Sequence, residues 1–426
     1  MKNYVVIQTA DKFLSEKKYI FDFIFKENLG IEYNIELNEE KNYTLIFEDK
    51  KIIINDAFFS KFNDCDIYYQ IDNIPQNICF FKYKGKKIPI IYGNDNLDFG
   101  DKEIFIGLDI ISSIFFMLTR WEEFAVNKKD IHARFDENYS LSKKYEFCNI
   151  PVVDFYLDIL FFYLKFPVIE KKYEKKSKLI FTHDIDYPYN TIKDIFPISS
   201  KNNRIDIIKN YIKKSYVTYE KLIKLGKKNN SNSIFFFMVN REAEFDLNNK
   251  YPKFNNKIKK YINKVLSSGH IVGLHTSYNT FLNIKKIKKE KFVLEKTIKR
   301  EVLHSRQHYL RINVPFTLRM LNSAGIKYEY SMGFSKFPGF RCGTGKNFNF
   351  YDFIERKKLK IKIFPFYFMD TYLNGKLPEL YDNTIKTDII IIIHNNYNAK
   401  KEKVKLIKEV IRHFKKHKKR KLCLNF

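Results

Sequence analysis

The sequence lacks several features that would assign it to common classes of protein. No stretch reaches the roughly 18 uninterrupted apolar residues of a membrane-spanning helix, so we expect no integral membrane segment. The first residues, MKNYVVIQTADKF, lack the long apolar region of a secretory signal peptide. The five cysteines are odd in number and far apart, and no Cys-x-x-Cys pair indicates a zinc ribbon or redox centre. A reducing, cytoplasmic location is the simplest interpretation.

The charge is strongly basic, because 77 lysines and arginines against 49 acidic residues give a net charge of +28. Such a charge is compatible with a nucleic-acid partner. The lysines are spread along the whole chain, however, which is typical of a solvated surface, and no nucleic-acid-binding motif accompanies them. We therefore expect no nucleic-acid partner. Contact with an acidic glycan, or peripheral contact with a membrane, stays open.

The chain is long enough for two domains, each with its own core. A highly charged segment, EKKYEKKSK at 170–178, is typical of a linker. We therefore predict a smaller α+β domain over residues 1–172 and a second domain over 177–426. In the first domain, short β-like runs and two apolar helices are expected at 43–55, 78–93, 102–109, 109–124 and 152–166.

After the linker, candidate strands alternate with candidate helices, which indicates a parallel sheet with right-handed crossovers. The strands are expected at 178–184, 233–239, 270–275, 306–312, 326–332, 360–366 and 388–394. The helices are expected at 205–226, 253–268, 284–303, 315–324 and 399–417. Seven strands over about 250 residues predict an α/β fold of the distorted (β/α)7-barrel type.

The most informative stretch is KLIFTHDID at 178–186, where an apolar strand leads into Asp184 and Asp186. Successive side chains of a strand point to opposite faces, so the two aspartates of an Asp-x-Asp at its end can point their carboxylates to the same side of the sheet. One carboxylate can then hold a metal while the other handles a proton. Helix or turn capping explains a single aspartate well. The pair after an apolar strand favours a metal-dependent hydrolase.

Other candidate site residues also follow apolar runs or sit in glycine-rich loops. His275 ends HIVGLH, and His394 ends DIIIIIH, where a lone titratable group suits a general acid. His308, in SRQHYLR, is another candidate metal ligand. Arg341, in GFRCGTG, is placed to pair with a carboxylate and fix its ionisation. For each histidine the alternative is a structural core residue, and for Arg341 it is a surface arginine.

In this order, these residues resemble the motifs of NodB-type polysaccharide deacetylases, carbohydrate esterase family 4 in the broad sense, over roughly 178–400. The resemblance implies a NodB-like barrel, a divalent metal cofactor, most simply zinc, and an acetylated sugar or polysaccharide as substrate. It makes Asp184 the general base and His394 the general acid. It makes Asp186 and His275 metal ligands, and Arg341 the arginine that orients the base.

GLHTSYNT, SRQHYLR and MGFSKFPGFRCGT resemble more specifically a bacterial branch with an extra N-terminal domain, often associated with surface-polysaccharide genes. The family usually has a second histidine four residues after the first, where this chain has Asn279. An amide oxygen is a poor zinc ligand. Either His308 substitutes, or water fills the place, or the metal site has decayed. Candidates for stacking on a sugar ring are Tyr187, Tyr189 and Tyr278.

Two alternative functions stay open beside the deacetylase. A catalytically silent glycan-binding homologue is favoured by Asn279. A glycosyltransferase could use the Asp-x-Asp pair to bind a metal and a nucleotide diphosphate, but this leaves His275 and His394 without a role. A hydrolase requires these distant segments to converge, so that the two acidic side chains and the two imidazoles share one cleft.

Overall fold

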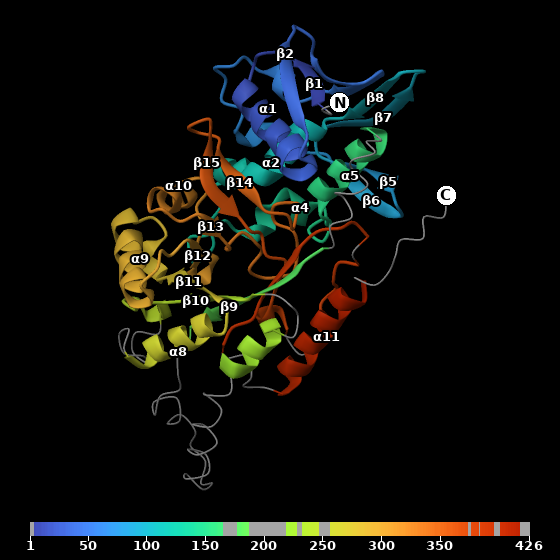
Figure 1. Ribbon diagram of the computed structural model, residues 1–426. Coiled ribbons are helices and arrows are strands. Elements are labelled where there is room, and N and C mark those ends of the chain that lie inside the picture. Colours follow the sequence, from blue (N-terminus) through green and yellow to red (C-terminus); the bar gives the residue numbers. More distant parts are fainter. Residues whose placement is uncertain are drawn as a thin grey trace.

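The computed structural model describes residues 4–164, 177–186, 219–227, 232–246, 256–373, 376–382, 384–395 and 401–417. These residues form a mixed α/β structure that contains a six-stranded, a nine-stranded and a two-stranded sheet. Figure 1 shows the six-stranded sheet and its helices at one end of the molecule and the nine-stranded sheet at the other. The predicted linker lies largely outside the described residues.

The six-stranded sheet has the order β2-β1-β3-β4-β8-β7. Its strands are β1 (Tyr4–Thr9), β2 (Glu32–Leu37), β3 (Asn42–Phe47), β4 (Lys50–Asn55), β7 (Gly93–Phe99) and β8 (Glu103–Leu108). A separate hairpin pairs β5 (Cys79–Tyr83) with β6 (Lys86–Ile90). The predicted β-like runs at 43–55, 78–93 and 102–109 thus contain strands, while the run at 43–55 is two strands joined by a tight turn at Glu48, which has φ 54°.

The helices of this part pack apolar side chains against the sheet. They are α1 (Leu14–Phe21), its π-helical continuation η1 (Asp22–Leu29), α2 (Ile110–Thr119), α3 (Trp121–Val126), α4 (Leu141–Lys144) and α5 (Val152–Leu164). Asp109 caps α2 by accepting a hydrogen bond from the Ser112 amide at 2.9 Å. The single helix predicted over 109–124 is two helices, because Arg120 has φ 53° and interrupts the helical backbone.

The nine-stranded sheet has the order β14-β15-β13-β12-β11-β10-β9-β17-β16. Its strands are β9 (Leu179–Ile185), β10 (Ile234–Phe237), β11 (Ile271–Thr276), β12 (His304–Gln307), β13 (Tyr328–Glu329), β14 (Phe348–Asp352), β15 (Lys357–Ile363), β16 (Phe368–Met369) and β17 (Ile389–Ile392). All neighbouring strands are parallel except β14 and β15. Helices α8 (Asn256–Ser267), α9 (Ile284–Ile298), α10 (Phe316–Ser323) and α11 (Lys401–His417) accompany it.

The predicted order of strands and helices agrees with this sheet, with three differences. The strand expected at 306–312 ends at Gln307, because the chain turns into the 3-10 helix η8 (His308–Leu310) with Tyr309 at φ 57°. Strands β14 and β16 were not predicted. The helix expected at 205–226 is described only from residue 219, and that part is helical. In the described residues no pairing joins β14 to β16, so closure into a barrel stays a prediction.

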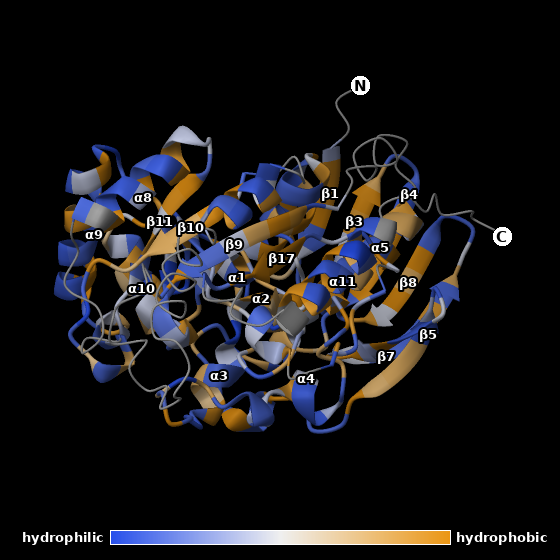
Figure 2. Ribbon diagram, turned by 90° about the horizontal axis from the view of Figure 1, so that it is seen from below, coloured by the Kyte–Doolittle hydropathy of each residue, from blue (hydrophilic) through white to orange (hydrophobic). Residues whose placement is uncertain are grey.

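One of two hydrophobic clusters contains residues from both halves of the chain. The cluster that contains the N-terminal sheet and helices α1, α2 and α5 continues into α10, β14 and β15, and a second cluster lies around β9, β10 and β17. The ring centroids of Tyr19 and Tyr351 are 5.0 Å apart, and Figure 1 shows β14 and β15 beside α2. Figure 2 shows apolar strands in the interior and hydrophilic outer faces on α8 and α9. The two halves of the chain therefore pack against each other through apolar side chains.

Within the described residues, no helix combines the length and the apolar character that crossing a bilayer requires.

Candidate metal-binding and catalytic site

The carboxyl ends of four parallel strands bring the predicted site residues together. β9 carries Asp184 and leads directly into Asp186, while β11 carries His275. His308 is the first residue after β12, and His394 is the second residue after β17. The ends of parallel strands meet at one edge of a sheet, which is where α/β proteins place ligands.

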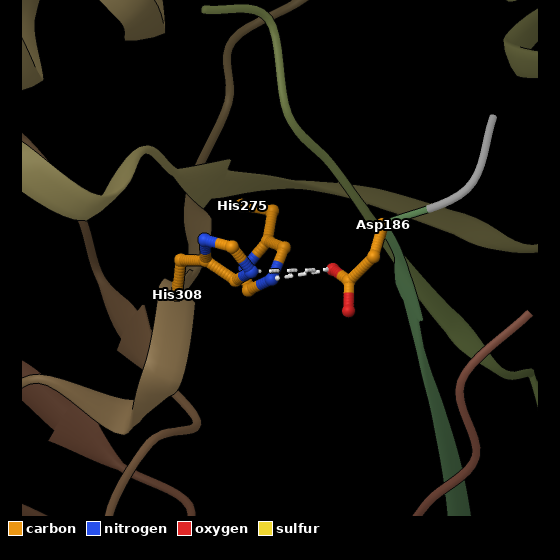
Figure 3. A group of neighbouring side chains, drawn as sticks. All are labelled: Asp186, His275 and His308. Carbon is orange, nitrogen blue, oxygen red and sulfur yellow. Dashed lines mark ion pairs between the residues drawn. The ribbon is translucent and has the colours of Figure 1, made fainter. Parts of the chain in front are cut away.

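Asp186, His275 and His308 form a set of potential metal ligands. One ligand atom from each lies within 4.8 Å of the other two. Nε2 of His275 lies 3.2 Å, and Nε2 of His308 lies 3.8 Å, from Oδ1 of Asp186. Figure 3 shows both imidazoles pointing toward this carboxylate. Asn279, by contrast, is exposed, and the second histidine next to Asp186 is His308.

Hydrogen bonds on the far side of each imidazole fix its orientation. Nδ1 of His275 is 2.9 Å from the carbonyl oxygen of Arg306, and Nδ1 of His308 is 3.0 Å from Oδ1 of Asp246. A ring that donates through Nδ1 to these acceptors presents the lone pair of Nε2 to the centre of the set. Asp246 is itself held, because it accepts hydrogen bonds from the backbone amides of Tyr278 and Ala243.

These residues fit a divalent cation. Oδ1 of Asp186 is buried and accepts no hydrogen bond, although two imidazole nitrogens face it. A divalent cation between this carboxylate and the two imidazoles would satisfy all three groups, and one carboxylate with two imidazoles is a common zinc ligand set. Burial would raise the pKa of Asp186, but the neighbouring imidazoles of His275, His308 and His394 hold it well below its usual range. The site therefore favours an ionised ligand.

Across this set, His394 faces both aspartates of the Asp-x-Asp pair. Its Nε2 lies 3.9 Å from Oδ2 of Asp184 and 3.8 Å from Oδ2 of Asp186. Its Nδ1 is 2.6 Å from Oδ1 of Asp370, and its backbone amide donates to Oδ2 of Asp370 at 3.1 Å. Burial would lower the pKa of His394, but Asp370, with Asp186 and Asp184, raises it to about 10. The protonated imidazole is therefore the dominant form at neutral pH.

The arginine beside Asp184 is Arg306 and not Arg341. Nη1 of Arg306 lies 3.5 Å from Oδ1 of Asp184, and its Nη2 donates to Oγ1 of Thr182 at 3.0 Å. Arg341 instead donates to both carboxylate oxygens of Glu123, at 2.9 and 2.6 Å, and to the carbonyl oxygen of Gly333. The prediction that Arg341 orients Asp184 is corrected, because the buried Glu123 from the N-terminal half occupies its guanidinium.

Three residues of the site were missed in the sequence. Asp370 follows the apolar run FPFYFM, so the signal that selected Asp184 was present there too. Arg306 lies two residues before His308, but its guanidinium faces Asp184. Asp246 lies in a short 3-10 helix, η6 (Glu244–Asp246), and nothing in its local sequence indicates a role. Of the predicted sugar-stacking residues, Tyr187 and Tyr189 lie outside the described residues, whereas Tyr278 lies beside Asp246.

Comparisons with known proteins give one family model and a set of similar solved structures. A family model described as a family of unknown function (DUF7033) matches residues 5–168. No curated protein matches the chain.

The similar solved structures include three of the carbohydrate esterase type. A proposed polysaccharide deacetylase from Mycobacterium smegmatis is 12% identical with a TM-score of 0.35, and the match covers 56% of this chain and 84% of that one. A chitin deacetylase from Colletotrichum lindemuthianum is 14% identical with a TM-score of 0.30, covering 57% and 84%. A CE4 family pseudoenzyme from Bacillus anthracis is 9% identical with a TM-score of 0.30, covering 57% and 62%. Both enzymes and a pseudoenzyme are thus among the neighbours.

Proposed function

We propose that this protein is a metal-dependent hydrolase that removes N-acetyl or O-acetyl groups from a sugar or polysaccharide. One observation carries the proposal: the buried carboxylate of Asp184 and the imidazole of His394 face each other beside a set of zinc-type ligands. Nε2 of His394 is 3.9 Å from Asp184, and both adjoin the set of Asp186, His275 and His308. A base, an acid and a cation site within a few ångströms are the parts that acyl hydrolysis needs.

In this proposal Asp184 and His394 divide the proton transfers between them. Asp184 takes a proton from the attacking water, which adds to the acetyl carbonyl carbon. His394, kept protonated by Asp370, gives a proton to the sugar nitrogen or oxygen as its bond to the acetyl carbon breaks. The products are acetate and the free amine or hydroxyl. Arg306 is the positioning residue for Asp184, because its guanidinium lies beside that carboxylate.

Asp186, His275 and His308 would hold the cation, and Asp246 and the carbonyl of Arg306 would orient the two imidazoles. A divalent ion bound there supplies Lewis acidity, which acidifies water and polarises the acetyl carbonyl. His308 supplies the second histidine that the family usually has at the position of Asn279. This substitution favours an enzyme over a decayed homologue.

The test is an acetate-release assay with zinc-supplemented protein over a panel of acetylated sugars and oligosaccharides. We expect acetate release by the wild-type protein and none above background by Asp186→Ala. Elemental analysis of the purified protein separates the remaining alternatives. Stoichiometric metal that disappears in Asp186→Ala, without acetate release on any substrate, would leave a metal-binding but silent glycan binder.

A nucleotide-sugar assay covers the glycosyltransferase alternative. Such an enzyme would consume a nucleotide sugar and release no acetate. Because that reaction leaves His275 and His394 without a role, we expect no consumption of nucleotide sugars by the wild-type protein.

A further inference from the structure

Aromatic side chains from both halves of the chain gather beside the proposed metal ligands. We call His132, Phe245, Tyr278 and Tyr309 the aromatic rim. The ring centroids of His132 and Tyr309, and those of Phe245 and Tyr278, are 4.5 Å apart. Tyr309 lies 5.5 Å from both Phe245 and Tyr278. The rim is therefore one connected cluster, to which His132 comes from the N-terminal half.

The rim adjoins the ligand set directly. Tyr309 follows His308 in the chain, and their ring centroids are 4.8 Å apart. Asp246, which holds His308, also accepts a hydrogen bond from the backbone amide of Tyr278 at 2.8 Å. Phe245 is the residue before Asp246. A molecule whose reacting group reaches Asp186 therefore lies within reach of these rings.

Two members of the rim face solvent. The exposed fraction is 42% for Phe245 and 37% for Tyr309. Apolar ring surface left in water beside a polar site is typical of a place that a ligand covers. Hydrogen-bonding groups surround these rings, since Nδ1 of His132 is 3.1 Å from the Tyr278 hydroxyl and two arginines, Arg134 and Arg311, lie close by. A sugar ring, with apolar C–H faces and hydroxyl edges, has the chemistry to match both features.

The loop at 127–136 that delivers His132 is held firmly in place. Asp130 accepts hydrogen bonds from the amides of His132 and Arg134, at 2.9 and 3.0 Å, and from Nε of Arg134. Across the boundary, Nη1 of Arg134 donates to the carbonyl oxygen of Tyr309, and Nε of Arg311 donates to that of His132, both at 2.8 Å. His132 is half-buried in this contact.

We propose that the aromatic rim binds a sugar ring of the substrate, and that the loop at 127–136 of the N-terminal half completes this binding site. The inference rests on the proposed function and gives the N-terminal half, which matches a family of unknown function, a part in it. Phe245 and Tyr309 supply the exposed faces on which the ring stacks, and His132 and Arg134 fix Tyr309 in position.

The test compares a substrate that has sugar rings with one that has none. The probes are triacetylchitotriose and 4-nitrophenyl acetate, and the variants are Phe245→Ala, Tyr309→Ala and His132→Ala. Phe292→Ala is the matched control, because Phe292 is 63% exposed on α9. For the rim variants we expect the ratio of kcat/KM on the triose to kcat/KM on the ester to fall about two- to tenfold, mostly through KM, as for one lost aromatic contact. The control should keep the wild-type ratio.

Equal losses on both probes in all three rim variants would overturn the inference. If the wild-type protein hydrolyses neither probe nor any member of the acetylated-sugar panel, the proposed function fails, and calorimetric titration with the triose then tests the rim alone. Binding that the rim variants weaken and Phe292→Ala does not would support the rim. No binding by the wild-type protein would overturn it. Phe245 and Tyr309 lie on different 3-10 helices, so misfolding of one variant leaves the other as a test.

Discussion

The guanidinium of Arg306 lies beside the carboxylate of Asp184, with Nη1 3.5 Å from Oδ1. Arg306 is fully buried, and the ring of Phe236 covers its guanidinium at 4.9 Å. A second buried arginine, Arg341, is paired with Glu123 from the N-terminal half. The two arginines therefore have separate roles, since one faces the residues of the proposed reaction and the other joins the two halves of the molecule.

Replacing each arginine by methionine should separate these roles. Removing one partner of a buried ion pair leaves the other charge without compensation, so we expect both variants to lose roughly 3–5 kcal/mol of unfolding free energy. Only Arg306→Met should also lose turnover per folded molecule, by roughly 10- to 100-fold, because Asp184 loses its adjacent positive charge. Urea unfolding and acetate release at low temperature, where both variants are folded, give the two quantities.

Arg306→Lys is the matched variant, because it keeps the charge and loses the planar guanidinium. We expect its turnover to lie between those of the wild-type protein and Arg306→Met. A loss of turnover in Arg341→Met as large as that in Arg306→Met would show that the arginines do not divide the work in this way.

Asp246 should tune metal affinity without touching the metal. It accepts a hydrogen bond from Nδ1 of His308 at 3.0 Å and so fixes the ring and increases the basicity of Nε2. We expect Asp246→Asn to weaken zinc binding by about 10–100-fold, as other second-sphere carboxylates do. Calorimetric titration of the metal-free protein with zinc measures this.

Asn279→Ala is the control for that titration, because Asn279 occupies the sequence position of the family's second histidine but its side chain is exposed. Its zinc affinity should equal that of the wild-type protein. An equal weakening in both variants would mean that Asn279 and not His308 completes the set.

The sequence predicted the residues that apolar strands deliver, because the carboxyl ends of parallel strands must meet. Asp184, Asp186, His275 and His394 all follow or end such strands. Nε2 of His394 lies within 4 Å of both aspartates, and Nε2 of His275 lies within 4 Å of Asp186. Arg341 was placed wrongly, because its partner Glu123 is 218 positions away and only the shared core brings them together.

The turns that position two of the site residues could not be predicted from the sequence, although His308 itself was a candidate ligand. His308 was expected within a strand, but its orientation depends on the turn in which Tyr309 and Leu310 have φ 57° and 56°. Neither residue is of a type that favours the left-handed region, so composition gave no sign of this turn. Asp246 also lies in a short 3-10 helix, which the sequence pattern did not indicate.

Asp184 and His394 should each be needed for turnover but not for metal binding. Their functional atoms face each other at 3.9 Å, and neither belongs to the set of Asp186, His275 and His308. We expect Asp184→Asn and His394→Gln to lose about 10²–10⁴-fold in kcat, the usual contribution of general acid–base catalysis. Acetate release gives kcat, and elemental analysis gives the bound metal.

Asp370→Asn is informative beside them, because Asp370 contacts His394 and no proposed ligand. It should lose less turnover than His394→Gln, since the acid itself remains. A loss of less than tenfold in Asp184→Asn or His394→Gln would contradict the role given to that residue.

Glu329 should make the stability of the protein depend on pH. Its side chain is buried in β13, where it accepts hydrogen bonds from the hydroxyls of Ser305 and Ser331 and from the Ser331 amide. Burial raises the pKa of Glu329 from 4.5 to about 7, against these hydrogen bonds and the charge of Arg306. The folded state therefore holds the proton more tightly than the unfolded chain does. Its stabilising contribution is fully present below pH 4.5, falls as the pH rises to about 7, and stays lost above that.

Glu329→Gln removes this titration. Because one pKa unit corresponds to roughly 1.4 kcal/mol, the unfolding free energy of the wild-type protein should fall between pH 5 and pH 8 by about 2 kcal/mol more than that of the variant. Urea unfolding of both proteins at the two pH values measures the difference. Glu39→Gln, which removes one exposed carboxylate, is the control and should follow the wild-type protein. Equal falls in the wild-type protein and Glu329→Gln would mean that Glu329 is already ionised in the fold at pH 5.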